Sequence, residues 1–385
     1  MMHIGFLTPE YPHPKVAHAA GLGTSVKNLA EALSKKGVEV TVFVYAQSRS
    51  EIFNENGITI YLIPDQNFLI GKWFFYRKFV QQYIQKIINS EKIDLLEVPD
   101  WTGVTAFMKF SVPIVVRFHG SDTYFCHIEN RKQKLKNRLF ETIAVRRAQG
   151  YIAPTRYAGE VSSRLFGIKH EKIQTIHHGL NLNQFKNDAP EIVEKNVILY
   201  IGTIIRKKGV FELPNIFNNI RIDFPEARLI LIGSDASDVY SGKNSTWELL
   251  QSMFSKDDLS NVTYLGKLPY EEIKNYIKKA NVCVFPTYAE TLGMVTIESM
   301  AMQKPVVNSS IGWAQELIKD GESGFLVYPN HHDLFANKIK SILADDKLSI
   351  EIGKSARLRV EKKFDIEKIV EQNKAYYRSL IINKH

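Results

Sequence analysis

Short apolar runs alternate with longer stretches of helical periodicity along almost the whole chain, and this alternation predicts repeated strand–helix–strand units. Such units need crossover helices, so they form parallel, doubly wound sheets with helices on both faces. In the first half we expect strands at 3–8, 38–45, 58–63, 93–97, 113–119, 150–154 and 172–176. The helices expected between them are 24–36, 73–90, 130–148 and 156–166.

The alternation pauses at residues 183–196, which are polar, contain a proline and lack a sustained apolar period. We interpret this stretch as a linker between two α/β domains, residues 1–185 and 190–365. The strands expected in the second half are 197–202, 229–233, 262–265, 282–286, 305–308 and 324–327. The helices expected there are 208–221, 269–279, 293–302 and several more after residue 331.

Composition narrows the class of protein. The chain has 385 residues, 44% of them hydrophobic and 24% charged, which is typical of a globular protein. Two cysteines, Cys126 and Cys283, are too few for a disulfide scaffold or a cysteine-ligated zinc site. With no apolar stretch long enough to span a membrane and no targeting segment, we expect a cytoplasmic protein, at most peripheral at a membrane. The net charge of +9 favours anionic partners without identifying one.

The first candidate site surrounds Glu290, because parallel sheets bind ligands at the carboxyl ends of their strands. A strand is expected to end at Pro286, and a helix to begin near Gly293. The amino terminus of that helix would offer N–H groups and a positive dipole end to a phosphate. Glu290 and Glu298 flank this position, which suits a ligand with both phosphates and hydroxyls. The alternative is a capping acid and a solvated helical glutamate.

A second candidate follows the strand that is expected to end at Gly202. Arg206, Lys207 and Lys208 come before the next helix, and cations at a strand's carboxyl end suit a diphosphate. The alternative is a solvated basic turn.

A third candidate lies in the first domain. Gly21-Leu22-Gly23 opens a helix where the backbone can approach a ligand closely. His119 and Asp122 follow another strand, and the nearby stretch 97–101, which includes Glu97 and Asp100, is expected to line the same cleft.

Motifs for other chemistry are missing. No Asp-x-Asp sequence occurs, and His177-His178 and His331-His332 are poorly spaced for joint metal ligation. We therefore assign no metal and no cofactor. The basic surface matches no nucleic-acid-binding motif, so nucleic acid is not an expected partner.

These residues together resemble the retaining glycosyltransferases of family 4, which have the GT-B fold of two Rossmann-like, doubly wound domains facing each other across a cleft. The most specific part is Glu-x7-Glu, Glu290 to Glu298, followed by Ser299-Met300-Ala301 and Lys304-Pro305-Val306-Val307. The other matching parts are Gly21-Leu22-Gly23, His178-Gly179 and Lys208-Gly209.

The resemblance implies a role for each matching position. Glu298 would bind the ribose hydroxyls and Glu290 those of the donor sugar. Lys208 and the loop amides would bind the diphosphate, and His119 would lie near the sugar and the acceptor. Other positions implied to bind substrate are Gly21, Leu22, Gly23, Asp122, Gly202, Gly266, Leu268, Thr291, Leu292, Gly293 and Met294. The last helix, 366–385, would pack back on the first domain.

Two positions depart from the family pattern. Thr203 stands where the family often has arginine directly after the glycine, and we expect Arg206 to supply that cation as a catalytic residue. Asn181 stands where aspartate is common.

The resemblance implies a metal-independent hexosyltransferase that retains the anomeric configuration by front-face displacement, the leaving phosphate taking the acceptor proton. The donor would be a nucleotide sugar, first a UDP-sugar and next GDP-mannose, and the acceptor a glycan or lipid-linked molecule in cell-surface polysaccharide or glycoconjugate biosynthesis. The alternatives are a GT-B-fold sugar-nucleotide epimerase and a catalytically silent protein that binds nucleotide sugars or glycans.

An anionic membrane surface is a further expected partner. Residues 73–79 mix aromatic with basic side chains, and a basic amphipathic surface suits a membrane-proximal acceptor. The alternative is that these aromatics form helix core. Further basic residues of the same domain are Arg131, Lys132, Lys134, Lys136, Arg138, Arg146 and Arg147.

Overall fold

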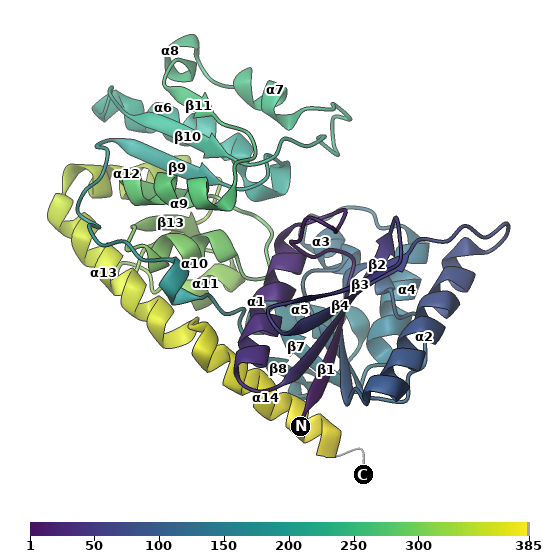
Figure 1. Ribbon diagram of the computed structural model, residues 1–385. Helices are drawn as coiled ribbons and strands as arrows, with labels where there is room; N and C mark the ends of the chain where they lie inside the picture. Colours follow the sequence, from purple (N-terminus) through teal and green to yellow (C-terminus); the bar gives the residue numbers. More distant parts are fainter. Residues whose placement is uncertain (383–385) are drawn as a thin grey trace. The chain divides into compact units, whose positions relative to one another are not determined.

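The computed structural model describes residues 1–382 and divides the chain into two compact units. The first comprises Met1–Asn181 together with the chain from Asp365 onward, and the second comprises Leu182–Phe364. In Figure 1 the first unit runs from purple to teal and includes the yellow terminal helix, and the second runs from teal through green to yellow.

The stretch 183–196, predicted to be a linker, is packed into the second unit. Arg357 donates a hydrogen bond to the carbonyl of Phe185 at 2.8 Å, and Lys304 donates one to the carbonyl of Pro190 at 3.2 Å. This stretch is therefore part of the second unit and not a free connection.

The sheet of the first unit has the strand order β3-β4-β2-β1-β5-β6-β7-β8, and every pair is parallel except β3 with β4. Its strands are β1 (His3–Thr8), β2 (Glu39–Gln47), β3 (Glu51–Glu55), β4 (Ile58–Pro64), β5 (Leu95–Pro99), β6 (Ile114–Arg117), β7 (Gly150–Ala153) and β8 (Ile173–Thr175). The antiparallel edge strand β3 was not predicted, and an all-parallel sheet was wrong at this edge. Asn56-Gly57, with φ of 52° and 78°, makes the hairpin turn and is the signal that would have revealed it.

Helices cover both faces of this sheet. α1 and α14 share one apolar core, and α2 contributes to another. The helix predicted from residue 130 begins only at Leu135, and α3 was not predicted. The helices are α1 (Gly21–Lys35), α2 (Lys72–Glu91), α3 (Asp122–Ile128), α4 (Leu135–Arg146), α5 (Arg156–Phe166) and α14 (Ile366–Ile382). Residues 383–385 of the predicted last helix lie outside the described residues.

A buried ion pair joins α14 to the sheet. Arg117 donates to Glu97 at 2.7 Å, and both side chains are almost fully buried. Asn373 and Tyr377 of α14 hydrogen-bond to this pair, so the terminal helix returns to the first unit beside α1, as Figure 1 shows. Glu97 was expected to line a ligand cleft, and that expectation is wrong, because its carboxylate is enclosed by these partners.

The sheet of the second unit is entirely parallel, with the order β11-β10-β9-β12-β13-β14. Its strands are β9 (Val197–Ile201), β10 (Arg228–Ile232), β11 (Val262–Tyr264), β12 (Val282–Phe285), β13 (Val306–Ser309) and β14 (Phe325–Val327). β9 and β12 are buried at every position, as expected for strands covered on both faces. The predicted fold class of two doubly wound α/β domains is confirmed.

The chain leaves β9 toward one edge of this sheet and returns at β12 toward the other, so these neighbouring strands form the switch point. The chain connections that follow them lead to opposite edges of the sheet, and in open α/β sheets ligands bind at such a point. The predicted helix 208–221 begins only at Leu213, after two short 3₁₀ turns, and α7, α8 and α11 were not predicted. The helices are α6 (Leu213–Asp223), α7 (Thr246–Gln251), α8 (Lys256–Leu259), α9 (Tyr270–Lys279), α10 (Met294–Ala301), α11 (Gly312–Leu317), α12 (His332–Ala344) and α13 (Asp346–Lys363).

Candidate functional site

The loops that follow β9 and β12 are fastened to each other through their backbones. The carbonyl of Lys207 accepts hydrogen bonds from the N–H groups of Tyr288 at 2.9 Å and Ala289 at 3.3 Å. Gly209 has φ of 69°, and a Cβ added there would lie 1.7 Å from the carbonyl oxygen of Pro286. Only glycine fits this approach, so the two loops hold a fixed relation at the switch point.

This relation brings two of the predicted catalytic residues together. The ammonium group of Lys208 donates a hydrogen bond to the carboxylate of Glu290. Their side chains are 21% and 19% exposed, so the pair is partly open to solvent and is not sealed inside the core. An anion arriving here would meet a cation that already has a carboxylate partner.

The amino terminus of α10 lies directly after this pair in the chain. Gly293 occupies the N-cap position with φ of 93°, and no side chain caps the helix. A Cβ on Gly293 would lie 2.9 Å from the Trp313 ring, which explains the glycine. The first N–H groups of a helix lack partners within it and attract anions, so the predicted role of the amides of Leu292 and Met294 has suitable geometry. Thr291 and Leu292 themselves are buried.

Glu298 lies one turn into α10 and is 6% exposed, so the alternative of a solvated helical glutamate is wrong. Its carboxylate accepts a hydrogen bond from the hydroxyl of Tyr270, the first residue of α9. Burial raises the pKa of Glu298 to about 7, although the Tyr270 hydrogen bond and Lys274 act in the opposite direction. Tyr270 was not predicted, and its position after Pro269 gave no chemical signal.

Arg206 has a partner of its own. Its guanidinium makes a bidentate contact with the carboxylate of Asp238, at 3.0 and 2.9 Å, and lies over the rings of Phe211 and Tyr240. The hydrogen bond from Arg206 lowers the pKa of Asp238. The contact ties the turn after β9 to the loop after β10. It favours a structural role for Arg206 as the alternative to the predicted catalytic role at a diphosphate, which no observation tests.

The remaining positions predicted in this unit lie at neighbouring strand ends. Gly202 follows β9 and donates to the carbonyl of Ile232, whereas the carbonyl of Gly266 accepts from Gly233. Gly266 has φ of 67° and no atoms within 4 Å of an added Cβ, and Leu268 lies shortly before α9. The substrate contact that the resemblance implied for both of these residues stays a prediction.

In the first unit the glycine loop is held by Glu10, which was not predicted. The N–H of Gly23 donates to the Glu10 carboxylate at 2.8 Å, and a Cβ on Gly23 would lie 2.8 Å from the Glu10 carbonyl. Gly21 and Leu22 form the start of α1, and its N-cap residue, Ala20, makes no side-chain hydrogen bond to the helix. Gly23 is therefore required by the neighbouring Glu10 backbone, and the predicted approach of this loop to a ligand stays a prediction.

His119 is positioned through its backbone by Asp100. The Asp100 carboxylate accepts from the N–H groups of His119 at 2.9 Å and Gly120 at 3.3 Å, and burial raises its pKa to about 7. The imidazole of His119 stacks on that of His178, with centroids 5.1 Å apart. Burial and the charge of Arg117 lower the pKa of His119 to about 3, so this imidazole is neutral near pH 7.

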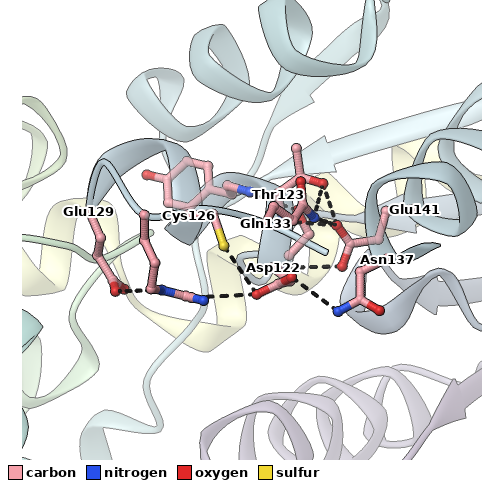
Figure 2. Close-up of polar contacts among 10 residues, drawn as sticks. Asp122, Thr123, Cys126, Glu129, Gln133, Asn137 and Glu141 are labelled. Atoms are coloured by element: carbon pink, nitrogen blue, oxygen red, sulfur yellow. Dashed lines mark hydrogen bonds and ion pairs between the residues drawn. The ribbon is translucent and has the colours of Figure 1, made fainter. Parts of the chain in front are cut away.

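The next backbone groups of the same segment are held by Glu141 of α4, which is fully buried. It accepts from the N–H groups of Asp122 at 3.0 Å and Thr123 at 2.9 Å (Figure 2). Two buried carboxylates, Asp100 and Glu141, thus hold consecutive amides from His119 to Thr123. Neither role was predicted.

The side chain of Asp122 is engaged within its own unit. It accepts from Asn137 at 3.1 Å, Cys126 at 3.3 Å and Arg131 at 3.4 Å, as Figure 2 shows. Burial would raise the pKa of Asp122, but these hydrogen bonds and the Arg131 charge lower it overall. Its predicted contact with substrate stays a prediction. Among residues 1–382 no group of three or more His, Cys, Asp or Glu side chains is arranged to hold a metal ion.

Two family models together match most of the chain. The model described as Glycosyltransferase Family 4 matches residues 19–184, and the one described as Glycosyl transferases group 1 matches residues 183–359. An uncharacterised glycosyltransferase of Methanocaldococcus jannaschii is 24% identical over 388 residues, which cover 99% of each chain.

Solved structures share the fold over the whole length. A sucrose-phosphate synthase from Thermosynechococcus elongatus has a TM-score of 0.82 at 23% identity, with 100% of both chains covered. HepE of Anabaena, in complex with UDP, has a TM-score of 0.76 at 20% identity and covers 98% of this chain and 100% of its own.

Proposed function

We propose that this chain, which belongs to glycosyltransferase family 4 and has the GT-B fold, transfers a sugar from a nucleoside-diphosphate sugar to a hydroxyl group of a glycan or lipid-linked acceptor. A UDP-sugar is the first donor to test, because the structurally similar HepE was crystallised with UDP. The product would be a cell-surface polysaccharide or another glycoconjugate.

One observation carries the proposal: the Lys208–Glu290 pair lies at the switch point of the second unit, immediately before the uncapped start of α10. A diphosphate there would accept hydrogen bonds from Lys208 and from the first amides of the helix. Glu290 would then exchange its lysine partner for hydroxyls of the sugar. Glu298, one turn further on, would accept from the ribose.

Each residue would act by a simple physical means. Lys208 would stabilise the negative charge that grows on the diphosphate as the glycosidic bond breaks, and such preorganised charge is often the largest catalytic contribution. The neutral imidazole of His119 would contact sugar or acceptor hydroxyls as a hydrogen-bonding group. We propose retention of the anomeric configuration, with the leaving phosphate accepting the proton of the acceptor, and no requirement for a metal ion.

The test separates binding from turnover. Nucleotide sugars are first screened by thermal shift, and binding and transfer are then measured with the stabilising donor. Glu298→Ala should weaken nucleotide binding at least tenfold. Lys208→Ala should leave donor affinity within a few-fold of parent and lower kcat by about 10²–10³, because its contact strengthens in the transition state.

Five results would contradict parts of the proposal. Unchanged nucleotide affinity in Glu298→Ala would contradict the assignment of Glu298 to the ribose. Loss of turnover in EDTA would show that the reaction needs a metal ion. An inverted anomeric product by NMR would remove retention. Formation of an epimerised nucleotide sugar without acceptor would show that the protein is an epimerase. Binding of nucleotide sugars without release of nucleotide in the presence of any acceptor would show that it is a catalytically silent binding protein.

A further inference from the structure

Large apolar side chains gather on one exposed surface of the first unit. Trp73 and Phe75 at the start of α2 are 42% and 49% exposed, and Leu69 and Ile70 just before it are more so. In Figure 1 this preceding segment extends away from the sheet. Leu135 and Leu139 of α4 are also exposed, at 83% and 54%.

Contacts between aromatic rings make α2 and α4 parts of the same surface. The Trp73 ring stacks on Phe140 of α4 with centroids 5.2 Å apart. The ammonium group of Lys136, one residue after Leu135, lies 5.9 Å from the centre of the Trp73 ring. We call this region the α2–α4 surface, comprising Leu69, Ile70, Trp73, Phe75, Lys132, Lys134, Leu135, Lys136, Arg138 and Leu139.

The sequence alone left open whether residues 73–79 form helix core. The structure divides them: Tyr76 and Phe79 pack against the core beneath α2, whereas Trp73 and Phe75 are exposed. Part of the aromatic run is therefore core, and part of it faces solvent.

Positive charge surrounds the apolar side chains. Lys132, Lys134, Lys136 and Arg138 are all exposed, and within the described part of the chain none of them lies in an ion pair with an acidic side chain. The nearby acids have other partners, since Asp122 and Glu129 both contact Arg131. The surface thus combines solvent-exposed leucines of α4 with uncompensated cations on α4 and directly before it.

We propose that the α2–α4 surface binds the anionic face of a lipid bilayer. Basic and apolar side chains together are what an interfacial surface needs: cations for the head groups, and leucine, isoleucine and tryptophan for the acyl boundary. A second copy of the chain is a poorer occupant, because a symmetric contact would place the same four cations against each other. The proposal stands on this surface and does not depend on the proposed transfer reaction.

Vesicle flotation of the full chain tests the proposal. At low salt the parent should float with phosphatidylcholine vesicles containing phosphatidylglycerol and not with pure phosphatidylcholine. Leu69→Ser with Ile70→Ser should reduce the bound fraction at least fivefold, as should Lys134→Gln with Lys136→Gln and Arg138→Gln. The matched control is Ile222→Ser with Leu358→Ser, which removes exposed apolar side chains of the second unit and should float like the parent.

The Tm and the far-UV circular dichroism of every variant should stay near the parent values, which shows that each has folded. Trp73 should report contact directly as a blue shift of fluorescence with anionic vesicles that Trp73→Phe lacks. Absence of flotation at low salt, equal flotation of parent and surface variants, or concentration-dependent dimerisation that the same substitutions abolish would each overturn the proposal.

Discussion

The two units hold their candidate site loops by different physical means. In the first unit the segment from His119 to Thr123 is held through its amides by two buried carboxylates, Asp100 and Glu141. In the second unit the corresponding loops meet through a close backbone approach at Gly209 and a partly exposed ion pair, Lys208 with Glu290.

The difference teaches which loop can respond to a ligand. A buried carboxylate that accepts backbone hydrogen bonds has no alternative partner, and removing it leaves several N–H groups unsatisfied. A partly exposed lysine–glutamate pair contributes little stability and can exchange partners when an anion arrives. We therefore expect the loop of the first unit to keep its conformation when a ligand binds. The charged side chains of the second unit should change their partners.

The largest effect should come from the backbone approach in the second unit. Gly209→Ala would place a Cβ 1.7 Å from the carbonyl of Pro286 and should reduce kcat/KM more than 100-fold or lower Tm by several degrees. Gly242→Ala is the matched control, since Gly242 has φ of 71° but nothing within 4 Å of an added Cβ. It should cost only the backbone strain of about 1 kcal/mol. Similar losses in both variants would show that strain, and not the contact between loops, makes Gly209 necessary.

The next largest effect should come from the carboxylates of the first unit. Glu141→Gln keeps one acceptor oxygen but turns an NH₂ group toward backbone donors, so we expect a loss of about 1–3 kcal/mol in stability. Transfer to the acceptor should fall roughly 10- to 100-fold, as expected when a positioned group is displaced. The affinity for the free nucleotide, measured by calorimetry, should stay at the parent value because the residues proposed to bind the nucleotide lie in the second unit. Glu129→Gln is the control, and weaker donor binding in Glu141→Gln would refute the separation of the two loops.

Much of the fold could be predicted from sequence because it depends on local patterns. Apolar runs located β1 with its observed bounds, and amphipathic periodicity did the same for α5. β3 was not predicted because an edge strand buries little apolar surface, and its many polar residues resemble those of a loop. α3 was not predicted because its seven residues are too few to show a helical period of apolar positions.

The candidate site divides in the same way. Glu290, Glu298 and Lys208 belong to short motifs, so the sequence alone could predict them as candidate site residues. Their supporting residues were not, because each acts across a long separation in the chain, such as 28 residues between Tyr270 and Glu298 and 32 between Arg206 and Asp238. Contacts between residues so far apart in the chain arise only when the protein folds, so they cannot be inferred from a single sequence.

The pH dependence of stability and of nucleotide binding should also differ between the two units, although this effect is smaller. Burial raises the pKa of both Asp100 and Glu298 to about 7, so both carboxyls gain a proton as the pH falls below neutrality. Since a raised pKa means that the folded state binds the proton more tightly than the unfolded state, each makes the unliganded protein less stable as pH rises through this range. Nucleotide binding should respond in the opposite direction, and only to Glu298, whose ionised form would accept from the ribose.

We therefore expect the nucleotide Kd of the parent to rise about tenfold between pH 8 and pH 6. Glu298→Gln should bind weakly at both pH values, whereas Asp100→Asn should keep the parent's pH dependence. Isothermal titration in buffers of matched ionic strength measures this. A pH dependence that Asp100→Asn removes would assign the effect to the first unit and contradict the role of Glu298.

The smallest effects should come from the two cations before Lys208, and they decide what Arg206 does. Lys207 holds the loops through its carbonyl, which alanine retains, so Lys207→Ala should stay within about twofold of parent. Arg206 contacts Asp238, so Arg206→Ala should loosen the loop after β10, lower Tm and raise the donor KM a few-fold with little change in kcat. If this is its role, Asp238→Asn should reproduce both changes, because it breaks the same contact from the other side. A 100-fold loss of kcat in Arg206→Ala beside a near-normal Asp238→Asn would instead place the guanidinium at the diphosphate. The second unit would then have two cations that respond to the donor, and the contrast with the fixed loop of the first unit would become stronger.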